Sequence, residues 1–231
     1  MKVGHWLALV TEMLSLTEVT IRMSGSEASK RMFEFFTQPH PRYKLIQNKR
    51  WGAGLFPLPD RFEDYLKGKD KQTLRTNRRR SLSLEHRFDT IEPSHYLNDI
   101  LAINESLQIR QGQPMDADYL NLEQLEMWTK DKPEIYGVFD RHGVLKAYAH
   151  APVCGEVFIL SRLLGHADEL ENGIMYLLIS EVVREMIERK YRDGMPLWAM
   201  YDTFFGASPG LRFFKERLGF RPYKARWVWK P

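Results

Sequence analysis

The chain has 231 residues, of which 43% are hydrophobic, 28% charged and 13% aromatic. This is an ordinary globular composition, with enough apolar residues for the core of one large domain or of a domain with an added subdomain. The single cysteine, Cys154, excludes a disulfide framework and a cysteine-based metal site within one chain, which fits a reducing cytoplasm. The net charge of +4 favours anionic partners, and no apolar run is long enough to span a bilayer.

The first half of the chain mixes short strands with helices. Ser26 can cap a helix that ends before Pro39, and Asp60 can cap a long basic helix. The segment Gln111-Gly112-Gln113-Pro114 separates two further helical patterns. The expected strands cover residues 17–23, 43–58 (one strand or two) and 88–91, and the expected helices cover residues 27–36, 61–84, 95–110 and 116–128.

The second half begins with three consecutive strand patterns, over residues 135–139, 144–153 and 156–164. Residues 140–143 make a good hairpin turn between the first two. A strongly amphipathic helix follows over residues 173–190, and then a strand over residues 197–203. This order includes a β–α–β crossover between neighbouring strands.

The end of the chain carries the clearest local signals. Ser208 is placed as an N-cap, Pro209 fits the first helical position, and Gly219 stands where a helix takes a left-handed C-cap. Leu211 and Leu218 fall on the same apolar face of this helix. Residues 223–229 then alternate in the manner of a strand.

The run Gly-Leu-Arg-Phe-Phe-Lys-Glu-Arg-Leu-Gly-Phe at residues 210–220, between two strand patterns, resembles the C-terminal motif of GCN5-related N-acyltransferases (GNAT) and most of all their FemAB-like branch. The resemblance implies an α/β (α+β) fold with a mixed, twisted central sheet flanked by helices. One such domain would fill residues 1–231. Residues 1–133 would form an N-terminal half with helical elaboration and residues 134–231 the core acyltransferase region, whereas FemAB peptidyltransferases resemble two such domains in tandem.

The resemblance also implies an activity, the transfer of an acyl group from an acyl thioester to an amine. Acetyl-CoA or another acyl-CoA is the default donor, used as a co-substrate without a metal. Two alternatives stay open: a FemAB-like transferase that uses aminoacyl-tRNA, and a catalytically silent module that binds RNA or another partner. An acyl carrier protein as donor partner, a small-molecule amine as acceptor, a cytoplasmic location and a homodimer complete these expectations.

The donor site is expected before the central helix, where the family's loop holds pyrophosphate on backbone N–H groups. Gly173 matches that loop, but carboxylates at Asp168, Glu169 and Glu171 stand beside it. These acids equally suit a helix N-terminus with no ligand. The residues implied for the thioester donor, including backbone donors for an oxyanion, are Leu163, Leu164, Gly165, Asn172, Gly173, Ile174 and Met175.

A basic segment between residues 67 and 80 resembles the basic helix of FemAB-like proteins. On one helix Arg75, Arg78 and Arg79 can share a face suited to phosphates, such as those of a tRNA, of coenzyme A or of an acyl carrier protein. A solvated helix face is the alternative explanation.

Acyl transfer to an amine needs a base for the ammonium proton and an acid for the leaving group. Many family members place a tyrosine where this chain has Phe214, so the expected catalytic residues are Tyr201, Asp202 and His150. Arg110 is expected to bind a carboxylate of the acceptor. Each of these residues could instead be structural. The seven histidines show no metal-ligand spacing, so no metal is expected.

Overall fold

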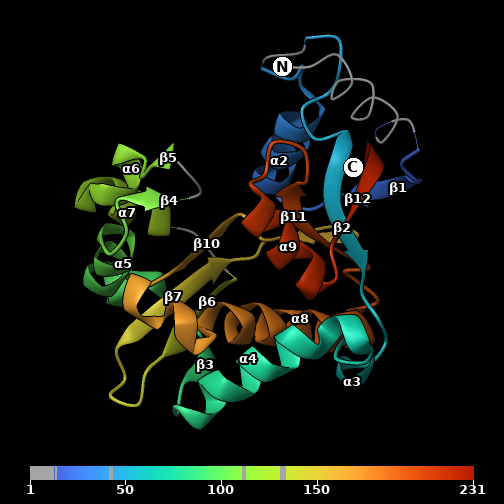
Figure 1. Cartoon of the computed structure of the whole chain (residues 1–231). Coiled ribbons are helices and arrows are strands. Elements are labelled where there is room, and N and C mark those ends of the chain that lie inside the picture. Colours follow the sequence, from blue (N-terminus) through green and yellow to red (C-terminus); the bar gives the residue numbers. More distant parts are fainter. Residues whose placement is uncertain (1–12, 14, 42–43, 111–112, 131–133) are drawn as a thin grey trace, which may run out of the picture.

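The computed structural model describes residues 13, 15–41, 44–110, 113–130 and 134–231, and Figure 1 shows the arrangement of their helices and strands. The strands are β1 (Glu18–Met23), β2 (Trp51–Pro57), β3 (Arg87–Thr90), β4 (Ile109–Arg110), β5 (Gln113–Pro114), β6 (Ile135–Phe139), β7 (Leu145–His150), β8 (Val153–Cys154), β9 (Val157–Ile159), β10 (Arg162–Gly165), β11 (Trp198–Thr203) and β12 (Arg221–Trp229). The α-helices are α2 (Glu27–Thr37), α3 (Phe62–Tyr65), α4 (Gln72–Ser83), α5 (Leu97–Glu105), α6 (Ala117–Leu120), α7 (Leu122–Thr129), α8 (Ile174–Asp193) and α9 (Pro209–Leu218). Short 3₁₀ turns are η1 (Lys69–Lys71), η2 (Pro93–Tyr96) and η3 (Ala167–Asn172).

The architecture confirms the expected α/β class, a mixed sheet flanked by helices, but the sheet is divided. Six strands form one sheet in the order β1-β12-β2-β11-β9-β8, and four form a second in the order β10-β7-β6-β3. The chain passes from the first sheet to the second between β9 and β10. Because β9 pairs parallel with β11 while β10 pairs antiparallel with β7, β10 and β11 diverge at this point.

The two halves of the sequence are interleaved in this fold. Strand β2 lies between β12 and β11, and β3 pairs with β6, so strands from residues 1–133 complete both sheets. Helix α8 contacts strands of the second sheet on one side and α4 on another, as Figure 1 shows. Its predicted apolar side, including Leu177, Leu178 and Val182, is buried in one cluster with Phe56 and Phe220.

The predicted caps of the last helix are confirmed. The Oγ of Ser208 accepts a hydrogen bond from the Leu211 N–H at 3.3 Å, and Gly219 has a left-handed φ of 106°. The following strand brings the C-terminus of the described chain beside β1, with which β12 pairs in parallel.

Several predicted elements are shorter in the structure. The helix predicted over residues 61–84 is interrupted at Gly68, whose φ of 98° is incompatible with a helix, and resumes only at Gln72. The helix predicted over residues 95–110 ends at Glu105, and Arg110 lies in β4. Asn121 divides the helix predicted over residues 116–128, because its side chain accepts a hydrogen bond from Gln124 N–H and caps α7.

The strand predictions also need correction. The strand predicted over residues 43–58 begins at Trp51, and residue 43 lies outside the described residues. The strands predicted over residues 144–153 and 156–164 are each divided in two, at the places where the chain leaves one sheet for the other. Over the described ranges, no helix has both the length and the apolarity needed to cross a membrane.

Candidate active site

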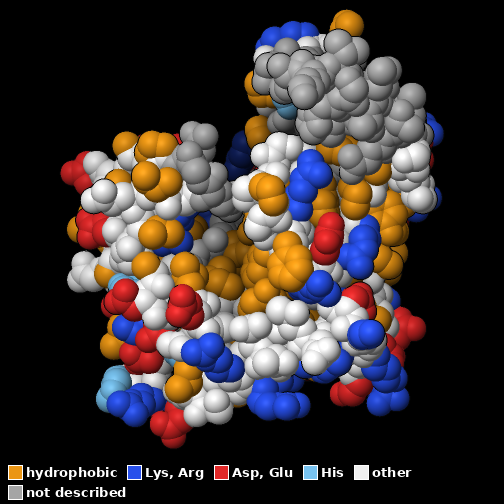
Figure 2. All heavy atoms as spheres, in the orientation of Figure 1, with side chains coloured by type: hydrophobic (Ala, Val, Ile, Leu, Met, Phe, Trp, Pro, Cys, Tyr) orange, Lys and Arg blue, Asp and Glu red, His pale blue; other side chains and the backbone are white. Residues whose placement is uncertain are grey.

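A cavity of about 1130 Å³ opens between the two sheets. Helix α2 and the end of β11 form one side, and β10 with residues of β4 and α6 forms the other. The space-filling view shows a notch between these two parts of the molecule (Figure 2). Six of the residues expected at the site line this cavity: Arg110, His150, Leu163, Leu164, Tyr201 and Asp202.

Backbone groups of β10 face this cavity because β11 has diverged from it. The N–H of His166 donates to the Lys146 carbonyl on β7, and consecutive residues of a strand direct their N–H and C=O groups to opposite sides. Leu164 therefore faces β7, whereas Leu163 and Gly165 face away. The Nη2 of Arg110 donates to the Gly165 carbonyl at 3.2 Å, which confirms this direction. Of the two expected oxyanion donors, the Leu163 N–H is the one that points into the gap.

Tyr201 and Asp202 form a bulge at the end of β11. The pairing with β2 shifts register between Met200 and Thr203, and Asp202 has a φ of 48°, which few non-glycine residues adopt. The backbone comes so close to β2 that a Cβ on Gly54 would lie 2.8 Å from the Tyr201 carbonyl oxygen. Strained backbone of this kind is concentrated at functional sites.

The side chains of this bulge are held differently. Lys49 Nζ lies 2.5 Å from Asp202 Oδ1, and the Asp202 side chain remains 57% exposed. Burial raises the pKa of Tyr201, and the negative charge of Asp202 raises it further. The Tyr201 hydroxyl therefore stays protonated at neutral pH and can act as a hydrogen-bond donor but not as a base.

His150, at the end of β7, contacts Ser161, which was not predicted from the sequence as a site residue. Its Nδ1 lies 2.8 Å from the Oγ of Ser161, which also lies 3.2 Å from the His150 carbonyl oxygen. The Trp128 ring packs against the imidazole at 5.9 Å with an interplanar angle of 85°. The serine and the histidine both line the cavity. They are eleven positions apart in the chain, and no local sequence pattern indicates that their side chains meet.

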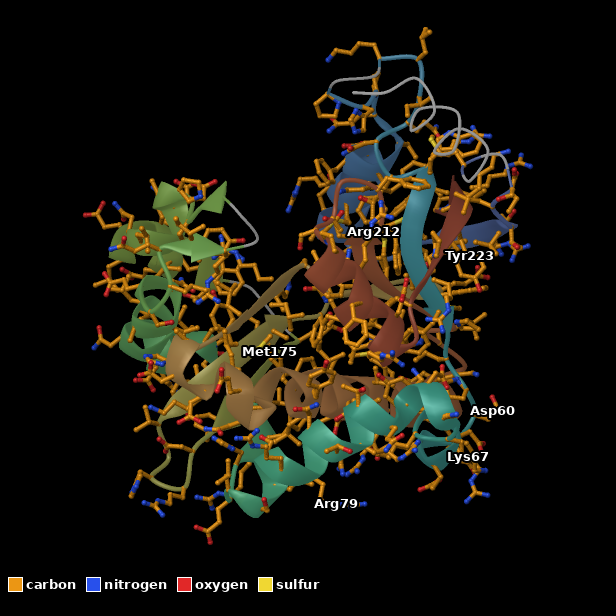
Figure 3. All side chains as sticks on the ribbon, viewed as in Figure 1. Asp60, Lys67, Arg79, Met175, Arg212 and Tyr223 are labelled. Atoms are coloured by element: carbon orange, nitrogen blue, oxygen red, sulfur yellow. The ribbon has the colours of Figure 1, made fainter. Side chains whose placement is uncertain are left out.

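The residues expected to hold a phosphate lie outside this cavity, at the start of α8. A Cβ on Gly173 would lie 2.4 Å from the Asn77 carbonyl oxygen, because α4 packs directly on this loop. Met175 packs against Gly165, and Ile174 is fully buried. The stick view shows Met175 at the front of the molecule (Figure 3).

The remaining loop residue, Asn172, donates from its amide to Glu169, whose carboxylate also lies 3.4 Å from His86 Nε2. The loop thus makes several contacts within the fold, and Gly173 is covered on the side of α4.

The three arginines of the basic segment do not form one free face. Arg75 donates to the carbonyls of Leu66 and Gly68 at 2.5 and 2.8 Å, so it closes the break between α3 and α4. Arg78 binds Glu181 of α8 through Nε and Nη2, at 3.0 and 2.5 Å. Only Arg79 points away from the molecule (Figure 3). The expected strip of phosphate-binding side chains is therefore corrected to one exposed arginine and two that hold helices together.

Phe214, at the position of the family's tyrosine, packs its ring against Tyr176 at 5.0 Å. Burial raises the pKa of the Tyr176 hydroxyl. The resemblance implied a tyrosine at position 214 of α9. Tyr176 instead places a phenol next to that position from α8. Over the ranges that the structure describes, no group of three or more His, Cys, Asp or Glu side chains is arranged to hold a metal ion.

No family model matches the chain, and no curated protein matches it. It is similar to the structure of L-PGS from Bacillus licheniformis, with 15% identity over 74% of this chain and 57% of that one and a TM-score of 0.49. It is also similar to the C-terminal domain of a putative lysylphosphatidylglycerol synthetase from Agrobacterium fabrum (18% identity, 74% and 60% covered, TM-score 0.44). A third similar structure is the ribosomal-protein-S18-alanine N-acetyltransferase from Escherichia coli (13% identity, 58% of this chain and 76% of that one covered, TM-score 0.43). The chain spans about three fifths of the length of the first two.

Proposed function

We propose that this protein is an N-acyltransferase, which moves an acyl group from an activated ester or thioester to an amine. The observation that carries the proposal is the gap between β10 and β11, into which the Leu163 N–H points while His150 and the Tyr201–Asp202 bulge line the adjoining cavity. The sequence resemblance at residues 210–220 points to the same chemistry.

In this proposal the acyl carbonyl lies in the gap beside β10. The amine nitrogen attacks the carbonyl carbon, and the Leu163 N–H stabilises the negative charge that develops on the carbonyl oxygen. His150, held by Ser161, takes the proton of the attacking amine. The new C–N bond forms as the C–S or C–O bond of the donor breaks, and the leaving group accepts a proton in turn. Tyr201 can donate a hydrogen bond at neutral pH, because its pKa is raised.

The carrier of the acyl group is the finer part of the proposal. Acyl-CoA is the first donor to test, with its phosphates at the start of α8, where Gly173 packs against Asn77 of α4. Acyl carrier protein and aminoacyl-tRNA are the alternatives, since both can present an acyl group to the gap without using that loop.

The experiment is a transfer assay with three donor classes. The purified protein is incubated with acetyl-CoA, a long-chain acyl-CoA or mixed aminoacyl-tRNA, together with a panel of primary amines, and products are identified by mass spectrometry. We expect transfer with one donor class. Replacement of His150 by Gln should lower the rate about 100-fold or more, as is typical for loss of a general base.

The matched control is His142→Gln, because His142 lies in the exposed turn between β6 and β7, away from the cavity. This variant should transfer at the wild-type rate. Absence of transfer with all three donor classes, or a His150→Gln rate equal to that of wild type, would overturn the proposal.

A further inference from the structure

Arg162 on β10 is held in an unusual environment for a charged side chain. Its guanidinium carbon lies 4.1 Å from the ring centroid of Tyr119 and 4.1 Å from that of Trp128. The cation thus packs against two aromatic rings, which hold it by cation–π contacts and shield it partly from water. Arg162 also lines the cavity of the proposed active site.

Two arginine nitrogens at this wall have no hydrogen-bond partner among the described residues. They are the Nη1 of Arg162 and the Nε of Arg110, and both are buried. Burial of an N–H without a partner is unfavourable, and more so for a charged group. Such a donor calls for an explanation, and a bound ion or ligand is one.

The two arginines line the same cavity, and both act on Tyr148 of β7. Burial raises the pKa of the Tyr148 hydroxyl, and the positive charges of Arg162 and Arg110 act to lower it. The Tyr148 hydroxyl donates to Asn104 Oδ1 at 2.9 Å, so it is already engaged. Arg110 is fixed as well, because its Nη2 donates to the carbonyls of Ile103 and Gly165. The unpaired Nε and Nη1 atoms are therefore held in place by their surroundings.

The charge of this wall is not balanced within the part of the chain that the structure describes. No carboxylate there lies within ion-pair distance of Arg110 or Arg162. Of the acids that line the rest of the cavity, Asp202 is paired with Lys49 and Glu134 with Arg189, and Glu27 lies on α2 on the opposite side. A ligand that enters this cavity therefore meets two fixed cationic edges and no nearby free carboxylate on the same wall.

We propose that Arg162 and Arg110 form an oxyanion-binding site, which takes a carboxylate or phosphate group of the amine acceptor. Each arginine brings one unpaired, buried N–H donor to this wall, and a guanidinium binds both kinds of oxyanion well. That the ligand is the acceptor rests on the proposed function, whereas the anion site itself does not. The acceptor class is then an amine that also carries an oxyanion, such as an amino acid, a peptide or a phosphorylated amine.

The test is calorimetric titration of the purified protein, without any acyl donor, with acetate, glycine, inorganic phosphate and phosphoethanolamine. We expect saturable binding of one oxyanion class, and binding of both amine-free and amine-bearing members of it. The Arg162→Met variant should bind about 10- to 100-fold more weakly, which corresponds to the loss of one charge-assisted hydrogen bond. Carboxylate binding would indicate an amino acid or peptide acceptor, and phosphate binding a phosphorylated amine.

The control is Arg141→Met in the exposed β6–β7 turn, which should leave the affinities unchanged. If Arg162→Met does not fold, Arg162→Lys keeps a cation next to the rings. It should still weaken binding, because lysine lacks the planar set of N–H donors of a guanidinium. Wild-type protein with labelled arginine side chains gives a measurement that needs no variant to fold, since the bound anion should shift guanidinium resonances. The site is overturned if none of the four probes binds, or if Arg162→Met binds as wild type does. Anion binding with no acyl transfer would keep the site and remove only the proposed function.

Discussion

At the scale of single residues, the burial of Lys215 in α9 was not predicted from the sequence. It is fully buried, donates from Nζ to the Thr203 carbonyl at 2.8 Å, and lies 4.7 Å from the Tyr201 ring centroid. Burial lowers its pKa to about 8, with Asp202 acting in the opposite direction. The lysine thus packs against the Tyr201–Asp202 bulge and hydrogen-bonds the residue after it, although burial of its ammonium group is unfavourable.

This pKa predicts a specific pH dependence of stability. Between pH 8 and 10.5 the unfolded chain keeps a proton on Lys215 that the folded protein has lost, so the free energy of unfolding rises with pH in this window. Replacement of Lys215 by Met removes that rise. The stability of wild type relative to the variant should therefore increase by up to about 2.5 kcal/mol between pH 7 and 10. Urea unfolding at several pH values measures it.

The control for this prediction is Lys30→Met, because Lys30 is exposed on α2. Its stability difference from wild type should not change with pH over the same window. A constant difference between wild type and Lys215→Met would show that Lys215 is charged in the folded protein at every pH tested, contrary to the prediction.

At the scale of elements, the contact between α4 and α8 requires a glycine at the start of α8. The helices meet where Gly173 lies against the backbone of Asn77, and Arg78 pairs with Glu181 about two turns further along α8. The chain uses glycine at the start of α8 because a side chain there would collide with a backbone carbonyl, which cannot move away as a flexible side chain could.

We therefore expect Gly173→Ala to be strongly destabilising. Gly173 and Gly194 flank the same helix with φ values of 80° and 77°, but a Cβ on Gly194 would meet nothing within 4 Å. Gly194→Ala should cost about 1 kcal/mol for the left-handed backbone alone. Gly173→Ala should cost about 1–3 kcal/mol more, because of the collision with α4. Urea unfolding of the two variants measures the difference, and equal losses would contradict the close packing of α4 on this loop.

At the scale of the whole molecule, one apolar cluster connects both sheets. It includes Phe56 of β2, Val138 of β6, Leu178 of α8 and Phe220, next to β12. Because strands from the first 133 residues lie between strands from the rest of the chain, neither half of the sequence has a complete sheet or core of its own. We propose on this ground that the chain forms one domain.

A single domain of this kind should unfold in one cooperative transition. Far-ultraviolet circular dichroism reports secondary structure, and tryptophan fluorescence reports tertiary packing at sites that include Trp51 and Trp198 in the six-stranded sheet and Trp128 in α7. We expect the two urea-unfolding curves to coincide. Two separated transitions, with residues 1–133 unfolding apart from residues 134–231, would contradict the single-domain proposal.

The sequence alone predicted those features that depend on neighbouring residues. The caps Ser208 and Gly219, the apolar face of α8 and the alternation in β12 arise from local backbone preferences and from one-sided burial, and the structure has all of them. The helix break at Gly68 was missed even though glycine was a signal for it, because the charged residues around it fit a helical pattern equally well.

Tertiary structure decided everything that depends on residues far apart in the chain. Arg78 is a partner of Glu181 across 103 positions, and it is therefore unavailable to phosphates although its sequence context is basic. Arg162 became a candidate ligand-binding residue only because α6 and α7 place Tyr119 and Trp128 against its guanidinium at the wall of the cavity. The gap beside Leu163 exists because the chain changes sheets at Leu160 and Ser161. Pairing between strands is set by the global packing of the sheets and not by local sequence, so the cavity could be found only in the folded molecule.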